Sequence, residues 1–478
     1  MQADETDVKH DEFKVKKKDR YRMEEKKNRS TFSGKIGFVL AAAGASVGLG
    51  NIWRFPYLAA KYGGGVFLLI YILLAVTFGY TMIVAESAIG RMTRKSPVGA
   101  FKSFGNKKWL SAGGWLNAII PVLIVPYYSV IGGWVIKYLV EYIKGNVRTI
   151  ATDNYFNEFI SDGVSTEIYF VIFSVITLLV IYAGVKNGIE RVSKFMMPVL
   201  IILSVVIMIY SVTRPGAIDG VRYFLVPHFD NFSWMSVVAA MGQMFYSLSI
   251  AMGILITFGS YMKKDTAIED STTNVEIFDT AIAIMAGLMI IPAVFAFSGG
   301  DPDTLKAGPS LMFITIPKVF ENMGLGSMVG ILFFLLVLFA ALTSSIALTE
   351  SAVSTFEDEL GWGRKKSAFA CGFIMLILGS LSCLGYGPFK GVKILGMQFL
   401  DFFDFATNSV MMPVAALLTS LLVSRVIGID RIEEEIKCGE GKFRRKAVFV
   451  IMIKYLCPVF AIIILLSSVA NAFGWISM

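Results

Sequence analysis

Residues 41–57 read AAAGASVGLGNIWRFPY and place three glycines inside an apolar segment of membrane-spanning length. Glycine costs about 1 kcal/mol relative to alanine in a helix interior, so Gly44, Gly48 and Gly50 predict a local break in the helix. In lipid, an unwound backbone is tolerated only inside a protein bundle or beside a watery cavity. The free carbonyl groups of such a break suit a hard cation, and free N–H groups at the start of a half-helix suit an anion.

Two polar residues follow these glycines. Asn51 supplies an amide oxygen, and Arg54 supplies a fixed positive charge near membrane depth. A charged side chain inside a membrane is costly, so a functional role is the default interpretation. The alternative is that the glycines only allow helices to pack closely. The stretch favours the core of a solute carrier.

The composition indicates an all-α polytopic membrane protein. The 478 residues are 55% hydrophobic and only 17% charged, whereas about a quarter of the residues of a soluble protein are charged. Apolar runs of about 20 residues recur along the chain. The net charge of +8 lies mostly in short loops and the N-terminal tail, so it does not indicate nucleic-acid binding. Two histidines, and four cysteines without metal-ligand spacing, argue against an enzyme and against a structural disulfide.

The chain divides into a tail, two halves and a final span. We expect residues 1–34 to form a disordered cytoplasmic tail, residues 35–213 and 233–427 to contain five spans each, and residues 447–478 to contain the eleventh span and an external C-terminus. The expected spans cover about 35–62, 65–89, 115–142, 167–184, 193–213, 235–261, 275–297, 328–356, 368–384, 398–427 and 447–473. Basic loops alternate with this topology, so a multi-pass protein of the cell inner (plasma) membrane is expected.

The first span of each half is interrupted. The counterpart of the glycine cluster in the second half is SLSIAMG, residues 247–253. Matched broken segments in corresponding halves are the best sequence indication of a transport site near the membrane midplane. The polar segment 298–324 is too patterned for disorder, and we expect a structured external hairpin or lid there.

Four motifs, in this order, resemble the neurotransmitter:sodium symporter family: GLGNIWRFPY, IPVLIVPYYSVIGGW, FYSLSIAMGILITFGSY and LFAALTSSIAL. The resemblance extends from about Arg29 to the end of the tenth span. It implies the leucine-transporter fold, a 5+5 inverted repeat in which helices 1 and 6 are broken. Eleven rather than twelve transmembrane helices are similar to a bacterial amino-acid transporter branch of the family. The resemblance also implies sodium-coupled symport by alternating access.

The resemblance further implies two Na+ sites made of oxygen ligands. The first would use Ser46, Asn51, Ser247 and Asp279, together with the carboxylate of the substrate. The second would use the backbone carbonyls of Gly44, Val47 and Ala340 and the hydroxyls of Thr343 and Ser344. Such hydroxyls often bond only to the preceding helical turn, but their place in FAALTSSIA favours the sodium site.

Asp279 stands where the family often has asparagine, and Ala283 stands where the leucine transporter has a glutamate. Many animal members need chloride to balance charge, and an acidic side chain nearby removes that need. The family resemblance therefore predicts two coupling Na+ ions and no chloride. The alternative is a buried aspartate that only caps polar helix packing.

The resemblance also indicates the substrate class. Amine carriers of the family have an aspartate where Gly48 stands, so here the substrate must bring its own carboxylate, as an α-amino acid does. The substrate-binding residues would be Ser46, Gly48, Gly50, Ile124, Tyr128, Tyr246, Ser247, Ser249, Met252, Ser344 and Leu348, with the N–H groups of Gly48 and Gly50 on the carboxylate. The side-chain lining carries no full charge and includes the pliable Met252. We therefore expect a hydrophobic L-amino acid, aromatic ones included.

Two charge pairs are expected to act as gates. Arg54 and Asp404, with Gln243 beside them and Tyr128 and Tyr246 as a cover, would close the external side. The cytoplasmic gate would consist of Arg29, Asp358 and Tyr261, although Phe32 stands where the family usually has tryptophan.

Two further features bear on the mechanism. Glu86 is expected to hydrogen-bond the unwound backbone, with proton relay as the alternative. The glycine and proline that bound residues 188–198 would let the start of the fifth span unwind.

Other classes of protein fit less well. A channel would need a continuous polar lining, and a membrane enzyme would need a nucleophile–base or metal constellation. An amino-acid sensor that resembles a transporter but lacks turnover remains the alternative function. The expected partners are a small amino-acid substrate, sodium and the lipid bilayer, with the protein as a monomer or weak homodimer.

Overall fold

The computed structural model describes residues 29–299 and 309–475, and its named elements are all helices. Most of the predicted N-terminal tail and the middle of the predicted external segment 298–324 lie outside the described residues. The rest of that segment is helical, which agrees with a structured element there. The label η marks π-helical or 3-10 turns.

The first half contains five apolar spans with short connecting helices. Its elements are α2 (Lys35–Ser46), η1 (Gly50–Arg54), α3 (Phe55–Lys61), α4 (Gly65–Leu74), η2 (Ala75–Gly79), α5 (Tyr80–Thr93), α6 (Pro97–Lys102), α7 (Lys108–Ile143), α8 (Val147–Ile150), α9 (Tyr155–Ser161), α10 (Gly163–Tyr182), η3 (Val185–Glu190) and α11 (Arg191–Val212). Several helices begin or end beyond the apolar stretch, because a helix continues into the interfacial region where polar residues are solvated.

The second half and the final span follow the same plan. Their elements are α12 (Ala217–Leu225), η4 (Phe229–Asn231), α13 (Trp234–Ser247), α14 (Ile254–Ser260), α15 (Ile268–Ser298), η6 (Leu311–Thr315), α16 (Ile316–Glu321), α17 (Gly326–Leu360), α18 (Arg364–Leu384), α19 (Phe399–Asp404), η7 (Phe405–Met411), α20 (Met412–Leu421), η8 (Leu422–Ile427), α21 (Ile429–Glu440), α22 (Lys446–Ile451), η9 (Met452–Leu456) and α23 (Cys457–Ala472).

Within the described residues, nine helices are long and apolar enough to cross a membrane. The pair Lys35–Ser46 and Gly50–Lys61, bent by 52°, makes a tenth span. The expected span 235–261 is instead two separate helices, α13 and α14, with residues 248–253 between them. Counting α13 and α14 together as one broken span gives the eleven spans that were predicted. A span made of two half-helices is what the predicted break requires.

The two breaks have different local causes. After α2, Val47 takes an extended conformation (φ −72°, ψ 96°) and the glycines follow. Between α13 and α14, three residues have left-handed φ values: Ser249 (53°), Ala251 (61°) and Gly253 (69°). Only the last is a glycine, so the surrounding contacts must offset a cost of roughly 1 kcal/mol or more for each of the other two.

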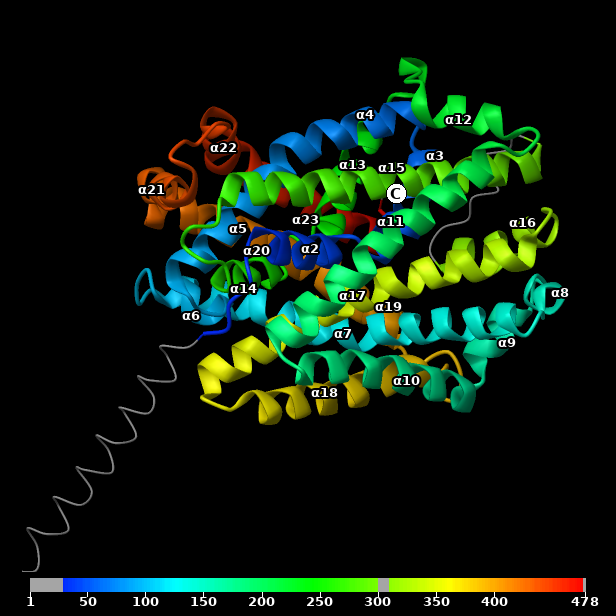
Figure 1. Cartoon of the computed structure of the whole chain (residues 1–478), viewed down its shortest axis with the longest axis horizontal. Coiled ribbons are helices and arrows are strands. Elements are labelled where there is room, and N and C mark those ends of the chain that lie inside the picture. Colours follow the sequence, from blue (N-terminus) through cyan, green and yellow to red (C-terminus); the bar gives the residue numbers. More distant parts are fainter. Residues whose placement is uncertain (1–28, 300–308, 476–478) are drawn as a thin grey trace, which may run out of the picture.

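The broken helices lie side by side in the bundle. The half-helix α13 packs against η1, and α14 packs against α2, while α17 packs against both α2 and α7. Figure 1 shows α2 near the centre of the view, with the long helices running alongside it. The short helices α8, α9, α12 and α16 gather at one end, and α6 and α21 lie at the other, which we call the Arg29 end.

A buried ion pair stabilises the Arg29 end. The Arg91 side chain on α5 is fully buried, and its Nε donates to Glu435 Oε1 of α21 at 2.7 Å. Its other nitrogens donate to the carbonyls of Thr266 and Glu435. This arginine therefore joins α5, α21 and the loop before α15.

We expect Arg91→Met to lower the free energy of unfolding by about 1–3 kcal/mol, because the buried carbonyls of Thr266 and Glu435 lose their donor while the Glu435 carboxylate keeps its ion pair with Lys264. Thermal unfolding of the purified protein in detergent measures this loss. Arg444→Met is the control, because that arginine is 67% exposed in its pair with Asp270 and exposed pairs contribute about 0–1 kcal/mol. Equal losses of stability in Arg91→Met and Arg444→Met would contradict the stabilising role assigned to the buried Arg91.

Candidate functional site

The first group of polar residues meets where the two broken helices approach α15. Asn51 Nδ2 lies 2.9 Å from Ser247 Oγ and 2.8 Å from Asp279 Oδ1. The Ser247 hydroxyl lies 2.9 Å from both carboxylate oxygens of Asp279. All three side chains are at most 1% exposed. The structure thus brings together three of the four residues predicted for the first sodium site.

Ser46 belongs to the same predicted set, but its hydroxyl is directed elsewhere. It donates to the carbonyl of Ala42 at 3.2 Å, within its own helix. Its side chain is therefore not placed on Asp279 in this conformation. A hydroxyl near a helix end has a carbonyl of the preceding turn within reach, which explains this contact.

Tyr71 is a member of this group that the sequence did not reveal. Its hydroxyl lies 3.0 Å from Ser247 Oγ and donates to Asp279 Oδ2 at 3.1 Å. The side chain is fully buried on α4 and packs edge-on against Phe55, with ring centroids 4.8 Å apart. In the sequence, a single tyrosine in the apolar run GVFLLIYILL gives no sign of this role.

The Asp279 carboxylate is buried without a cationic partner. Its hydrogen-bond donors are Asn51, Ser247 and Tyr71, and no ion pair among the described residues includes it. A buried carboxylate with neutral donors alone is costly. Oxygen atoms that converge on such a charge suit a hard monovalent cation, and Asn51 could turn its Oδ1 to the ion. The chemistry of this group therefore fits sodium.

The second group lies where α17 crosses the break after α2. Ser344 Oγ is 3.3, 3.1 and 3.4 Å from the carbonyl oxygens of Gly44, Ala45 and Val47. Thr343 Oγ1 lies 3.1 Å from the carbonyl of Ala340, one turn back in its own helix. The structure thus brings three of the five predicted members together, Gly44, Val47 and Ser344, and adds the carbonyl of Ala45, whereas the Thr343 hydroxyl bonds within its own helix to Phe339 and Ala340.

The predicted carboxylate site has a different arrangement of N–H groups. Gly48 N donates to Asn51 Oδ1 at 3.1 Å, so it is already used. The N–H group that reaches the Tyr128 hydroxyl, at 3.3 Å, belongs to Leu49. In this conformation the N–H of Gly48 is thus engaged by Asn51 and that of Leu49 by Tyr128, and donation by Gly48 and Gly50 to a carboxylate stays a prediction. The turn after Val47 points successive N–H groups in different directions, which residue type alone does not reveal.

Neighbouring side chains lie so close to Gly48 and Gly50 that neither position has room for a Cβ atom. A Cβ at Gly48 would lie 2.7 Å from Ser344 Oγ and 3.0 Å from the Tyr128 hydroxyl. A Cβ at Gly50 would lie 2.4 Å from the ring of Tyr246. Even a methyl group at these positions would enter the space between the break, α7 and α17.

One predicted lining residue, Ser249, joins the two breaks, and most of the others are buried. Ser249 Oγ donates to the carbonyl of Ala45 at 3.0 Å, which joins the two breaks directly. The predicted lining is buried at Ile124, Tyr128, Ser249, Met252, Ser344 and Leu348, whereas Tyr246 is half-buried.

Glu86 supports the unwound backbone between α13 and α14. Its Oε1 accepts a hydrogen bond from the N–H of Ala251 at 2.8 Å. Ala251 has a left-handed φ, so its N–H is outside any helical ladder. The predicted structural contact of Glu86 is therefore confirmed.

The contacts predicted for the gate at the Arg29 end are present in this structure, and their gating role stays a prediction. Arg29 pairs with Asp358 at 2.7 Å and also donates to Ser260 and Ser354, each at 2.8 Å. Its guanidinium lies 5.2 Å from the ring centroid of Tyr261. Burial lowers the pKa of Arg29, but Tyr261 and Asp358 together raise it above its ordinary value. The guanidinium thus stays charged in this contact.

Phe32 anchors the same end without the indole of a tryptophan. It is 1% exposed and packs edge-on against Phe258 and Tyr261, with ring centroids 5.6 and 5.9 Å apart. The Tyr261 hydroxyl donates to Glu350, which pairs with Arg364 at 2.6 Å. This second ion pair was not predicted from the sequence.

The gate predicted for the opposite end is not paired in this structure. The ion pairs among the described residues do not join Arg54 to Asp404. Arg54 lies over the ring of Tyr246, 5.3 Å from its centroid, and Asp404 accepts from the Tyr127 hydroxyl at 3.2 Å. Gln243 donates to the carbonyl of Gly50 at 3.0 Å and so supports the break. Of the two predicted charge pairs, Arg29–Asp358 is the one that forms an ion pair in this conformation.

The predicted unwinding segment is helical in this conformation. The turns of η3 continue into α11, and Pro198 lies inside that helix. Glu190 holds the segment to the start of α2, because it accepts from Ser33 N at 2.9 Å and pairs with Lys194 at 2.6 Å. Unwinding of this segment stays a prediction.

We expect Tyr71→Phe to destabilise the protein by about 1–3 kcal/mol, because Asp279 then loses a buried donor. Thermal unfolding without added sodium measures the loss. Tyr142→Phe is a matched control, since the Tyr142 hydroxyl is buried without a hydrogen-bond partner among the described residues. A loss no greater than that of the control would show that the Tyr71 hydroxyl does not stabilise the carboxylate.

Comparison with known proteins agrees with this geometry. The model of the sodium:neurotransmitter symporter family matches residues 29–167 and 140–474. An uncharacterized sodium-dependent transporter of Bacillus subtilis, YhdH, is 35% identical over 92% of this chain and 97% of its own length. A similarly named protein of Haemophilus influenzae is 32% identical over 94% of this chain and 99% of its own length.

A solved structure shows the same fold. The crystal structure of MhsT in complex with L-phenylalanine is 34% identical, with a TM-score of 0.83, and the match covers 92% of this chain and all of that one. The predicted leucine-transporter fold is thereby confirmed, and the family consists of secondary transporters rather than enzymes. With its family model, relatives and fold in agreement, this chain belongs to the sodium:neurotransmitter symporter family.

Proposed function

We propose that the protein is a chloride-independent symporter that uses sodium to import a hydrophobic L-amino acid by alternating access. The observation that carries this proposal is the buried Asp279 carboxylate, which has three neutral donors and no cationic partner. A sodium ion would compensate this charge. The negative charge of Asp279 would in turn replace the chloride that other family members need.

The substrate class is inferred from the space around the breaks. Gly48 leaves no side chain to pair with an amine, so the substrate would supply a carboxylate. The Tyr128 hydroxyl would donate to it, together with the N–H of Gly48 once Asn51 turns its Oδ1 to sodium. The lining holds Ile124, Met252 and Leu348, which favour an apolar side chain. The bound L-phenylalanine of the similar MhsT supports this inference.

Two sodium ions would supply the driving force. Each charge that crosses about 100 mV contributes roughly 2.3 kcal/mol, and a tenfold gradient adds about 1.4 kcal/mol. The formed Arg29–Asp358 pair and the separate Arg54 and Asp404 correspond to a state closed at one end. In alternating access, the Arg29–Asp358 pair would separate when the Arg54–Asp404 pair forms.

Orientation follows from the basic loops. Arg94 and Lys107 lie in the connections before and after α6, which is at the Arg29 end in Figure 1, and Lys186 and Lys365 lie in η3 and in the first turn of α18. We assign the Arg29 end to the cytoplasm. The N-terminus would then be cytoplasmic and the C-terminus external. We propose a multi-pass inner-membrane protein that acts as a monomer or weak homodimer.

Uptake of radiolabelled amino acids into proteoliposomes tests this function. We expect accumulation of Leu, Met, Phe, Tyr or Trp that needs an inward sodium gradient and is unchanged when gluconate replaces chloride. Binding without accumulation would indicate a sensor. Accumulation that required chloride would contradict the role of Asp279.

The matched variant for this experiment is Asp279→Asn, which keeps the shape of the side chain and removes its charge. We expect chloride-free uptake to fall by about tenfold or more, equivalent to about 1.4 kcal/mol, with partial recovery when chloride is added. Unchanged sodium activation in this variant would exclude Asp279 as the compensating charge.

The glycines of the break allow a second test. We expect Gly48→Ala to weaken sodium-dependent phenylalanine binding by about tenfold or more, because its Cβ would meet Ser344 and Tyr128. Gly242→Ala on α13 is the control, since nothing lies within 4 Å of its added Cβ. Scintillation proximity binding measures both. Equal affinities in the two variants would show that the substrate does not bind next to Gly48.

A further inference from the structure

An apolar groove lies on the outside of the bundle. None of its lining residues belongs to the predicted substrate site, and it opens to the surroundings of the protein. It encloses about 410 Å³ between α10, α11 and α17. Its walls include Ile176 and Val180 of α10, Phe195 and Met196 of α11, and Leu342 and Ile346 of α17. Figure 1 shows these three helices crossing on the face turned toward the reader.

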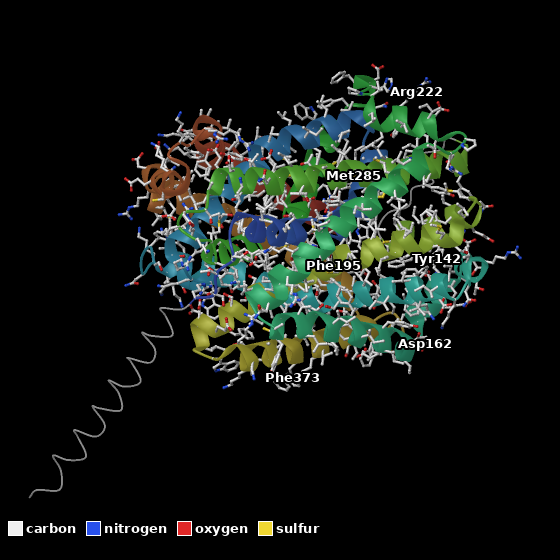
Figure 2. All side chains as sticks on the ribbon, in the orientation of Figure 1. Tyr142, Asp162, Phe195, Arg222, Met285 and Phe373 are labelled. Carbon is white, nitrogen blue, oxygen red and sulfur yellow. The ribbon has the colours of Figure 1, made fainter. Side chains whose placement is uncertain are left out.

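The groove faces the surroundings of the protein. Phe195, labelled on this face in Figure 2, is 65% exposed, and Ile176 is 36% exposed. In the span that contains α10, only 33% of the most apolar 18-residue stretch is buried inside the protein. The corresponding share for the span that contains α11 is 39%. In a membrane, such a surface is covered by lipid chains.

One charged residue borders this apolar surface. Arg191 is exposed and lines the groove one helical turn from Phe195, about 6 Å along the axis. No ion pair among the described residues includes Arg191, whereas its neighbour Lys194 pairs with Glu190. A guanidinium presents several donors in a planar fork that matches phosphate oxygens.

We propose that this groove binds an anionic phospholipid, with its phosphate on Arg191 and one acyl chain along the wall between α11 and α17. The apolar walls match the chain, and the Arg191 guanidinium, which lines the groove outside any ion pair of the described residues, matches the charge of the head group. Each buried CH2 group contributes about 0.8 kcal/mol in such a contact.

The bound chain would contact the helices that flank the second polar group. Leu342 directly precedes Thr343, and Ile346 follows Ser344 by two residues on α17. The opposite wall is the start of α11, which the predicted unwinding must move. The lipid would therefore hold α11 against α17 and strengthen sodium binding. This consequence rests on the proposed sodium site, but lipid binding does not.

Native mass spectrometry of the full chain, titrated with phosphatidylglycerol or phosphatidylcholine, tests the binding. We expect Arg191→Gln to weaken phosphatidylglycerol binding about fivefold or more, equivalent to about 1 kcal/mol. Lys186→Gln, in the same connection but outside the groove, should have little effect. Equal losses in the two variants would indicate only general attraction of basic residues to an anionic surface, and would overturn the proposal.

A second pair of variants tests the position of the chain. Ile176→Trp fills the groove from α10 and should weaken binding of the same lipid. Ile172→Trp, one turn away at a position 42% exposed outside the groove, should not. Equal binding by both variants would place the acyl chain elsewhere.

The effect on sodium is measured separately, in vesicles with and without phosphatidylglycerol. We expect the lipid to lower the sodium concentration for half-maximal uptake in the wild type and in Lys186→Gln, but not in Arg191→Gln. If lipid binding follows Arg191 and sodium activation does not change, the site stands and the proposed effect on sodium is wrong. If no variant shows sodium-driven uptake, the proposed function fails, while the lipid titration still decides the site.

Discussion

The structure depends on the placement of one carboxylate in the middle of the bundle. Asp279 is fully buried, and the groups that surround it come from three separate segments: the break after α2, the end of α13, and α4. A charge in such a place destabilises the fold unless its donors and a cation compensate it. The stability of the fold therefore depends on the three neutral donors that meet this carboxylate, which explains why Tyr71, Asn51 and Ser247 all face one point.

The breaks themselves depend on side chains from neighbouring helices. An interrupted helix leaves N–H and C=O groups without partners, which is unfavourable in a membrane. Glu86 accepts from Ala251, Gln243 donates to Gly50, and Ser249 donates to Ala45. Each contact joins a break to another segment. The half-helices are consequently held in place from several sides, yet they stay short enough to move as units.

The two ends of the bundle differ in how their charges are arranged. At the Arg29 end, Arg29 pairs with Asp358, and Arg364 pairs with Glu350. At the opposite end, Arg54 is held by the ring of Tyr246 while Asp404 bonds to neutral groups. Both sets of contacts are local to their own end. Under the proposed alternating access, a change of state would separate one set of contacts and form the other.

The sequence by itself determined the class of protein, the break after Ser46, and most members of the polar groups, because hydropathy, glycine spacing and motif order are local properties. It could not show that Tyr71 reaches Asp279, that Leu49 rather than Gly48 offers its N–H to Tyr128, or that Arg54 and Asp404 are apart in this state. It also missed Ala45, whose carbonyl is a backbone atom that any residue supplies. Only the tertiary structure decided these points, since hydrogen-bond direction and contact between distant segments depend on how the helices pack.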